Sequence, residues 1–243
     1  MFWRRQRAAM ERFHPLHRAL IDQRGFTVSL RRDDWEPVIR SLAGHGLEVK
    51  RRKWAPPPRT ATVLVPLVRV LTADMRPEGV LSVAADLRGP TAPGKATPEQ
   101  QLPVRHPVKS LKQWFVIDPW LRMRAELRDG SVLEFQVTDR IRHRKLRKTN
   151  PRGKIKFKRK SKTVQLVRVI RHLPKGAAHR RPDTPPPAWF SVRVKTGSRM
   201  VIRATGKFQG PVADPELTKA ILQMTTEPFR WTPPGTITPR RKP

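Results

Sequence analysis

Residues 121–137 read LRMRAELRDGSVLEFQV. Apolar residues alternate with charged or polar residues along both halves of this stretch, and Asp129-Gly130 separates the halves. Strict alternation is typical of a strand with one buried face, and Asp-Gly between two such runs indicates a tight hairpin turn. The stretch therefore predicts an antiparallel hairpin. Its expected buried side chains are Leu121, Met123, Leu127, Leu133, Phe135 and Val137.

The residues after this hairpin predict more strands and one helix. Residues 164–170 are rich in β-branched side chains, and 190–204 contain two alternating runs around a Thr-Gly-Ser turn. Both patterns are typical of antiparallel strands. Closer to the end, Asp214 and Pro215 are residue types that start helices, and apolar residues recur at helical spacing behind them. We expect a helix near 215–226.

The residues before the hairpin predict a smaller mixed lobe. Residues 26–30 alternate like a strand, and a helix is expected over 34–44 because aspartate precedes an apolar stripe that ends at glycine. A further strand is expected to begin at 47–49. The apolar runs 61–71 and 80–87, joined by a turn, are interpreted as a second hairpin.

The predicted fold class is α+β, predominantly antiparallel β. We expect a hairpin-rich sheet or a partly open barrel, with a small N-terminal α/β lobe and a C-terminal helix. The expected division of the chain is a helical or flexible segment at 1–23, a small α+β lobe at 24–88, a proline-rich linker at 89–108, an antiparallel β lobe at 109–232, and a disordered basic tail at 233–243.

Composition narrows the classes of function. The 243 residues hold 52 Lys and Arg against 19 Asp and Glu, a formal net charge of +33. A charge of this size makes the compact state repel itself unless anions are near, so a polyanionic partner is expected. The chain has no cysteine, which excludes disulfides, thiolate catalysis and zinc–thiolate sites. No apolar run approaches the ~18 residues of a membrane span, and we expect a soluble cytoplasmic protein.

The positive charge is concentrated in one segment. Residues 140–162 contain 13 Lys or Arg and no acid. Arginine richness alone is a weak indication, because GC-rich codon usage favours arginine. That bias depletes lysine, however, and seven of the seventeen lysines lie between Lys145 and Lys162.

Charge in this segment follows the period of a strand. Lysines recur at every second residue from Lys154 to Lys162, so in a strand they share one face, with Ile155 and Phe157 on the other. Arginines recur in the same way at 140, 142 and 144, and residues 150–153 have turn composition. The segment therefore predicts a basic β-hairpin. Two readings are open: a ribbon that contacts phosphates and fits a major groove, or a solvated and partly disordered charged loop.

A second basic segment, Lys50 to Lys53, precedes Trp54. A base could stack on this tryptophan while the charges hold its phosphates, or the ring could simply cover the core at the end of a strand. The candidate nucleic-acid-binding residues are Arg140, Arg142, Arg144, Lys145, Arg147, Lys148, Arg152, Lys154, Lys156, Lys158, Lys160 and Lys162 in the hairpin, and Lys50, Arg51, Arg52, Lys53 and Trp54 in the second segment.

No constellation of residues points to catalysis. His14 and His17 are three residues apart, but no carboxylate completes a metal site, and the acids at 33, 34 and 36 stand where helix caps belong. Phosphate loops and nucleophile elbows are missing from the sequence. We expect a protein without cofactor, metal or turnover that binds nucleic acid with little sequence preference. The alternative is an assembly protein whose basic arm docks on an acidic protein or an anionic membrane surface.

Overall fold

The computed structural model describes residues 2–150 and 152–232, which form an α+β fold built on an open, antiparallel sheet. The strands lie in the order β1-β2-β4-β5-β6-β8-β7, with β3 beside β4. Their bounds are β1 (Gly25–Arg31), β2 (Val80–Asp86), β3 (Gln100–Leu102), β4 (Val108–Glu126), β5 (Val132–Thr149), β6 (Ile155–His172), β7 (Phe190–Lys195) and β8 (Val201–Gln209). The expected fold class is confirmed, with an open sheet in place of a barrel.

The hairpin predicted for 121–137 is confirmed. It joins β4 to β5, with Met123 opposite Phe135 and Leu121 opposite Val137. All six side chains expected to be buried are at most 4% exposed. The predicted pairing of 190–195 with the strand after it is also observed, as β7 against β8.

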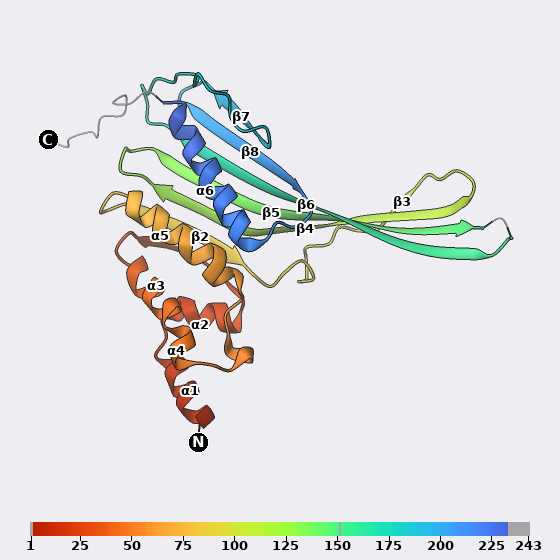
Figure 1. Cartoon of the computed structure of the whole chain (residues 1–243), viewed down its shortest axis with the longest axis horizontal. Helices are drawn as coiled ribbons and strands as arrows, with labels where there is room; N and C mark the ends of the chain where they lie inside the picture. Colours follow the sequence, from red (N-terminus) through yellow and green to blue (C-terminus); the bar gives the residue numbers. More distant parts are fainter. Residues whose placement is uncertain (1, 151, 233–243) are drawn as a thin grey trace.

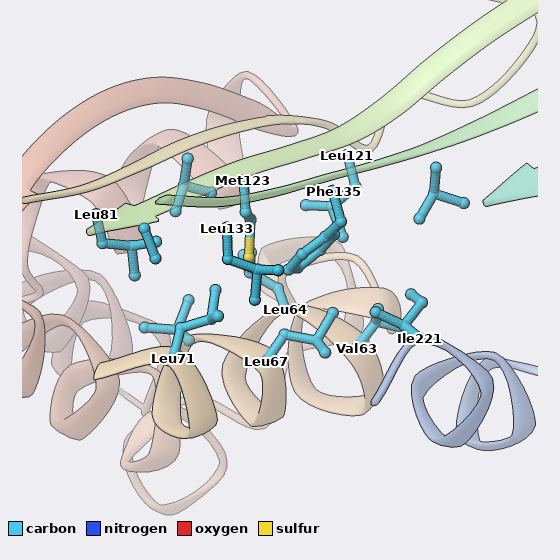
Figure 2. Close-up of a cluster of buried hydrophobic side chains, with 14 of the residues drawn as sticks. Val63, Leu64, Leu67, Leu71, Leu81, Leu121, Met123, Leu133, Phe135 and Ile221 are labelled. Carbon is cyan, nitrogen blue, oxygen red and sulfur yellow. The ribbon is translucent and has the colours of Figure 1, made fainter. Parts of the chain in front are cut away.

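Helices cover one face of the sheet. Their bounds are α1 (Phe2–Glu11), α2 (Pro15–Asp22), α3 (Trp35–Ala43), α4 (His45–Glu48), a 3-10 turn (Arg52–Trp54), a π turn (Thr60–Leu64) that continues into α5 (Val65–Asp74), and α6 (Asp214–Arg230). Helices α5 and α6 lie across the sheet, while α1 to α4 gather beyond its β1 side (Figure 1). In Figure 2, Leu64, Leu67 and Leu71 point up from the helical layer toward Met123 and Phe135 of the strands. None of the helices in the described ranges is long and apolar enough to cross a membrane.

Two predicted strands of the N-terminal lobe are wrong. Residues 61–71 are helical, because Val63, Leu67 and Leu71 recur at four-residue spacing and bury one helical face against the sheet. Such an apolar run does not distinguish a buried strand from a buried helix by its composition. Residues 47–49 belong to the end of the short helix α4 and the residue after it.

Strands β4, β5 and β6 continue beyond the helical layer and form a projecting arm. We define the arm as residues 108–118, 139–149 and 155–165, together with β3; the remaining sheet and the helices are the body. The arm extends away from all the helices (Figure 1), over about 35 Å at ~3.3 Å per residue. A register shift between Asp118 and Leu121 in β4, at Pro119, marks its root.

The segment 89–108, predicted as a linker, runs beside the arm. Thr97 N donates a hydrogen bond to Phe115 O at 2.8 Å, and Ile117 N donates one to Lys95 O at 2.9 Å. One sheet is continuous on both sides of this segment, because β2 pairs directly with β4. The predicted disordered tail at 233–243 lies outside the described residues.

A buried ion cluster secures the root of the arm. Lys95 Nζ lies 2.7 Å from Asp118 Oδ1 and 2.9 Å from Asp86 Oδ2, and the side chains of Lys95 and Asp118 are 8% and 1% exposed. Burial raises the pKa of the Asp118 carboxyl, and the bond from Lys95 opposes that rise. A hydrogen bond from Arg88 holds the pKa of Asp86 well below its usual range. The cluster thus ties the segment beside the arm to β2 and β4.

We expect Lys95→Met to destabilise the protein by about 3 kcal/mol, because it leaves the Asp118 carboxylate buried without a cation. Urea unfolding at pH 7 measures this effect. Lys195→Met, on an exposed lysine of β7, is the matched control and should change stability by less than about 0.5 kcal/mol. Adding Asp118→Leu to Lys95→Met should recover most of the loss. Equal effects of the two lysine substitutions would contradict a structural role for the cluster.

Candidate nucleic-acid interface

The register of the arm brings like charges together on one face. Arg142 lies opposite Lys162, Arg144 opposite Lys160, and Lys148 opposite Lys156. Partners in an antiparallel ladder point to the same side of the sheet, so these side chains share a face. We call it the basic face. It consists of Arg140, Arg142, Arg144, Lys148, Lys156, Lys158, Lys160 and Lys162.

The cations of the basic face have no acidic partners among the described residues. In the described ranges no carboxylate oxygen lies within 4.0 Å of any of them, whereas the body pairs many of its cations. Arg171 is an example from the body: only 1% exposed, it is bound by Asp129 and by Ser131 Oγ at 3.0 Å. The positive charge of the basic face is therefore left for solvent or for a bound anion.

The opposite face of the arm carries different chemistry. Trp114 stacks on His143 with ring centroids 5.0 Å apart, and Lys145 Nζ lies 4.8 Å above the tryptophan ring. Lys145 also pairs with Glu99 at 2.9 Å. Lys145 and Arg147, two of the predicted contact residues, therefore lie on this opposite face and apart from the lysine row.

The hairpin predicted for 140–162 is present, with Ile155 and Phe157 on the side away from the lysines. These two side chains do little packing, because Ile155 is 48% and Phe157 80% exposed. The turn is closed by Asn150, whose Oδ1 accepts a hydrogen bond from Lys154 N at 2.8 Å. Arg152 and Lys154 are exposed at this turn. Residue 151 lies outside the described residues.

The ribbon is wider than the sequence indicates. Strand β4 pairs with β5 along the arm from Val108 to Asp118, so three strands lie side by side for most of its length. Strands are ~4.8 Å apart, which gives about 10 Å between the outer strand axes before side chains are counted. A major groove ~12 Å wide admits two strands. The three-stranded part of the arm is therefore suited to a nucleic acid that lies across its face. It is less suited to insertion into a major groove.

A hollow at the root of the basic face is not predicted by the sequence pattern. It has a volume of about 330 Å³, and Phe115, Val164 and Leu166 form its apolar part. Four cations also line it: Arg140, Arg142, Lys162 and Lys207. The Arg140 guanidinium carbon lies 4.4 Å from the centre of the Phe115 ring. These residues come from β4, β5, β6 and β8, which only the sheet order brings together.

The second predicted segment is separate from the arm. The cations of Arg51 and Lys53 lie 5.0 Å and 5.2 Å from the centre of the Trp54 ring. The half-buried Trp54 also packs on a small core of Ala9, Phe13, Ile21 and Val49, while Lys50 and Arg52 are exposed nearby. This packing accounts for the tryptophan without a ligand.

The histidines noted in the sequence form a buried hydrogen-bonded chain. His17 Nδ1 lies 3.0 Å from Ser41 Oγ, and His17 Nε2 lies 3.1 Å from His45 Nδ1. Burial, with smaller contributions from His45 and His14, lowers the pKa of His17 to about 4, so the ring is neutral at neutral pH. The chain joins α2 to α3 and α4. Within the described ranges, no three His, Asp or Glu side chains gather as a metal site.

The fold and this interface define an open-sheet α+β protein with a projecting basic arm. No family model, characterised protein or solved structure matches the chain.

We expect Lys160→Glu to stabilise the arm, because it replaces the repulsion between residues 160 and 144 with attraction. Cross-strand charge pairs contribute roughly 0.2–1 kcal/mol, so amide hydrogen exchange over 142–148 and 156–162 should slow by up to about fivefold. The effect should shrink at high salt. Lys219→Glu on α6, which makes the same charge change, should leave these amides unaffected. Equal or faster exchange in Lys160→Glu would contradict like-charge strain on the basic face.

Proposed function

We propose that this protein binds nucleic acid, without catalysis and with little sequence preference, through the basic face of its arm. One observation carries the proposal: on the basic face, cations stand directly opposite cations in adjacent strands, and none of them has a carboxylate within 4.0 Å in the described part of the chain. Like charges placed opposite one another destabilise a sheet. A bound polyanion removes that cost, because each phosphate near the face neutralises the charges around it.

Protection of a sheet edge does not explain the whole face. Strand β6 is an edge of the arm, and lysines on edge strands prevent unwanted pairing with other chains. That role accounts for the lysines from Lys156 to Lys162. It does not account for Arg142 and Arg144, which lie on β5 between β4 and β6. The central arginines therefore favour a binding surface over edge protection alone.

The chemistry of the face favours contacts to phosphate. Lysines on alternate residues are ~6.5–7 Å apart along β6, and the arginine row lies one strand spacing away. Lysine and arginine contacts to phosphate position a nucleic acid but carry no sequence information. Asparagine and glutamine, the side chains that pair with adenine edges, are represented on this face by Gln100 and Gln113 alone in the described strands of the arm.

The decisive variant replaces Lys154, Lys156, Lys158, Lys160 and Lys162 by Gln. We expect an intact fold, because these side chains are exposed. On duplex DNA, loss of four to five phosphate contacts should make the slope of log affinity against log salt shallower by roughly four units. Fluorescence anisotropy with a labelled duplex between 0.05 M and 0.3 M salt measures the slope.

A matched control removes five exposed charges from the body by changing Arg18, Arg69, Lys175, Arg199 and Lys219 to Gln. This control has the same net charge as the arm variant but should keep the wild-type slope within about one unit. Polyglutamate and anionic vesicles are titrated in parallel. Equal slopes in both variants would contradict the proposal, and tighter binding of polyglutamate or vesicles than of DNA and RNA would favour an acidic protein or membrane partner instead.

A further inference from the structure

The hollow at the root of the arm continues the basic face. It lies where β8 ends at Gln209 and leaves β6 as the edge of the arm. Lys162 belongs to both features, because it is the last lysine of the row on β6 and also lines the hollow. A nucleic-acid strand whose phosphates contact the lysine row therefore reaches the hollow.

The lining of the hollow selects for two properties in one ligand. Phe115, Val164 and Leu166 provide apolar contact, which favours a flat hydrophobic group. Arg140, Arg142, Lys162 and Lys207 surround this surface, and none of them has a carboxylate partner among the described residues. Among the residues that the structure describes, no acidic side chain lines the hollow. A ligand that fits must combine an aromatic or apolar ring with negative charge.

The size and stacking geometry fit one nucleotide. A volume of about 330 Å³ is at the lower end of small-ligand sites, ~300–1,000 Å³. The Arg140 guanidinium lies over the Phe115 ring, with 4.4 Å between its carbon and the ring centre. A planar guanidinium on an aromatic ring offers its outer side to a base, and proteins that bind single strands use such stacking platforms.

We propose that this hollow holds one unstacked nucleotide, with the base stacked on the Arg140–Phe115 pair and its phosphate held by Arg142, Lys162 and Lys207. The inference rests on the proposed function and deepens it. A paired base inside a duplex cannot enter the hollow, so the protein prefers single strands, or strands with an extruded base, to a fully paired duplex.

The test compares Phe115→Leu with Phe157→Leu. Both remove a phenylalanine ring from the arm, but Phe157 lies on the opposite face and is 80% exposed. The probes are a fluorescein-labelled 12-nucleotide single strand and a 12-base-pair blunt duplex. Stacking on an aromatic side chain contributes ~1–3 kcal/mol per base, so Phe115→Leu should weaken single-strand binding about fivefold or more. Duplex affinity and both salt slopes should not change, and Phe157→Leu should bind single strands like the wild type.

Two further measurements keep the proposal testable if Phe115→Leu folds poorly. Phe115→Tyr keeps the ring and should retain the wild-type preference for single strands. In the unmodified protein, an oligonucleotide carrying 4-thiouridine should cross-link under ultraviolet light to residues of the hollow, located by mass spectrometry of the peptides. Cross-links confined to the turn at 152–154 would overturn the proposal.

The outcomes separate this inference from the proposed function. If the wild type binds single strand and duplex equally, and Phe115→Leu does the same, the hollow is not a base site although the basic face still binds nucleic acid. If the wild type binds neither probe, the proposed function fails and this inference fails with it. Titration with adenosine monophosphate shows whether the hollow binds a free nucleotide or only a nucleotide within a nucleic-acid strand. Saturable binding that Phe115→Leu abolishes indicates a free nucleotide, and binding of the oligonucleotide alone indicates a nucleotide within a strand.

Discussion

A continuous ladder of backbone hydrogen bonds through β4, β5 and β6 is the constraint on which this structure depends. The pairing of β5 with β6 runs without a register shift from Val132 opposite His172 to Thr149 opposite Ile155. One half of the ladder is held by apolar packing beneath α5 and α6, and the other half projects from it with little packing of its own. Because no register shift interrupts the pairing of β5 with β6, the exposed face of the body continues into the basic face, and the helix-covered face continues into the side that carries His143 and Phe157.

Under the proposed function, this arrangement assigns stability to one half of these strands and binding to the other half. The body buries its apolar side chains and pairs the cations that it buries, as Arg171 with Asp129 shows. The arm leaves the cations of its basic face exposed or half-buried and without an acidic partner in the described residues. Since the arm is anchored by the ladder and by the ion cluster at its root, it can carry repelling charges that an isolated hairpin could not hold in order. Under the proposed function, a bound polyanion would relieve the remaining repulsion.

The sequence predicts those features that depend on short-range periodicity. Alternation around Asp129-Gly130 correctly predicts the central hairpin, and lysines on alternate residues correctly predict one charged face with Phe157 on the other. Periodicity failed at 61–71, where apolar residues occur too densely to separate strand from helix. Features that depend on the sheet order could not be predicted. The pairing of 108–118 with β5 makes the arm three-stranded, and the meeting of Phe115, Arg140 and Lys207 creates the hollow, yet none of these contacts has a local signal in the sequence.

The central claim is that the basic face is the surface that nucleic acid covers. Lysine footprinting tests it most directly: the protein is acylated briefly with and without a single-stranded oligonucleotide, and the modified peptides are measured by mass spectrometry. The account predicts that Lys156, Lys158, Lys160 and Lys162 lose reactivity on binding, while Lys175 and Lys219 on the body react as before. Uniform reactivity with and without the oligonucleotide, or protection confined to Lys50 and Lys53, would contradict it.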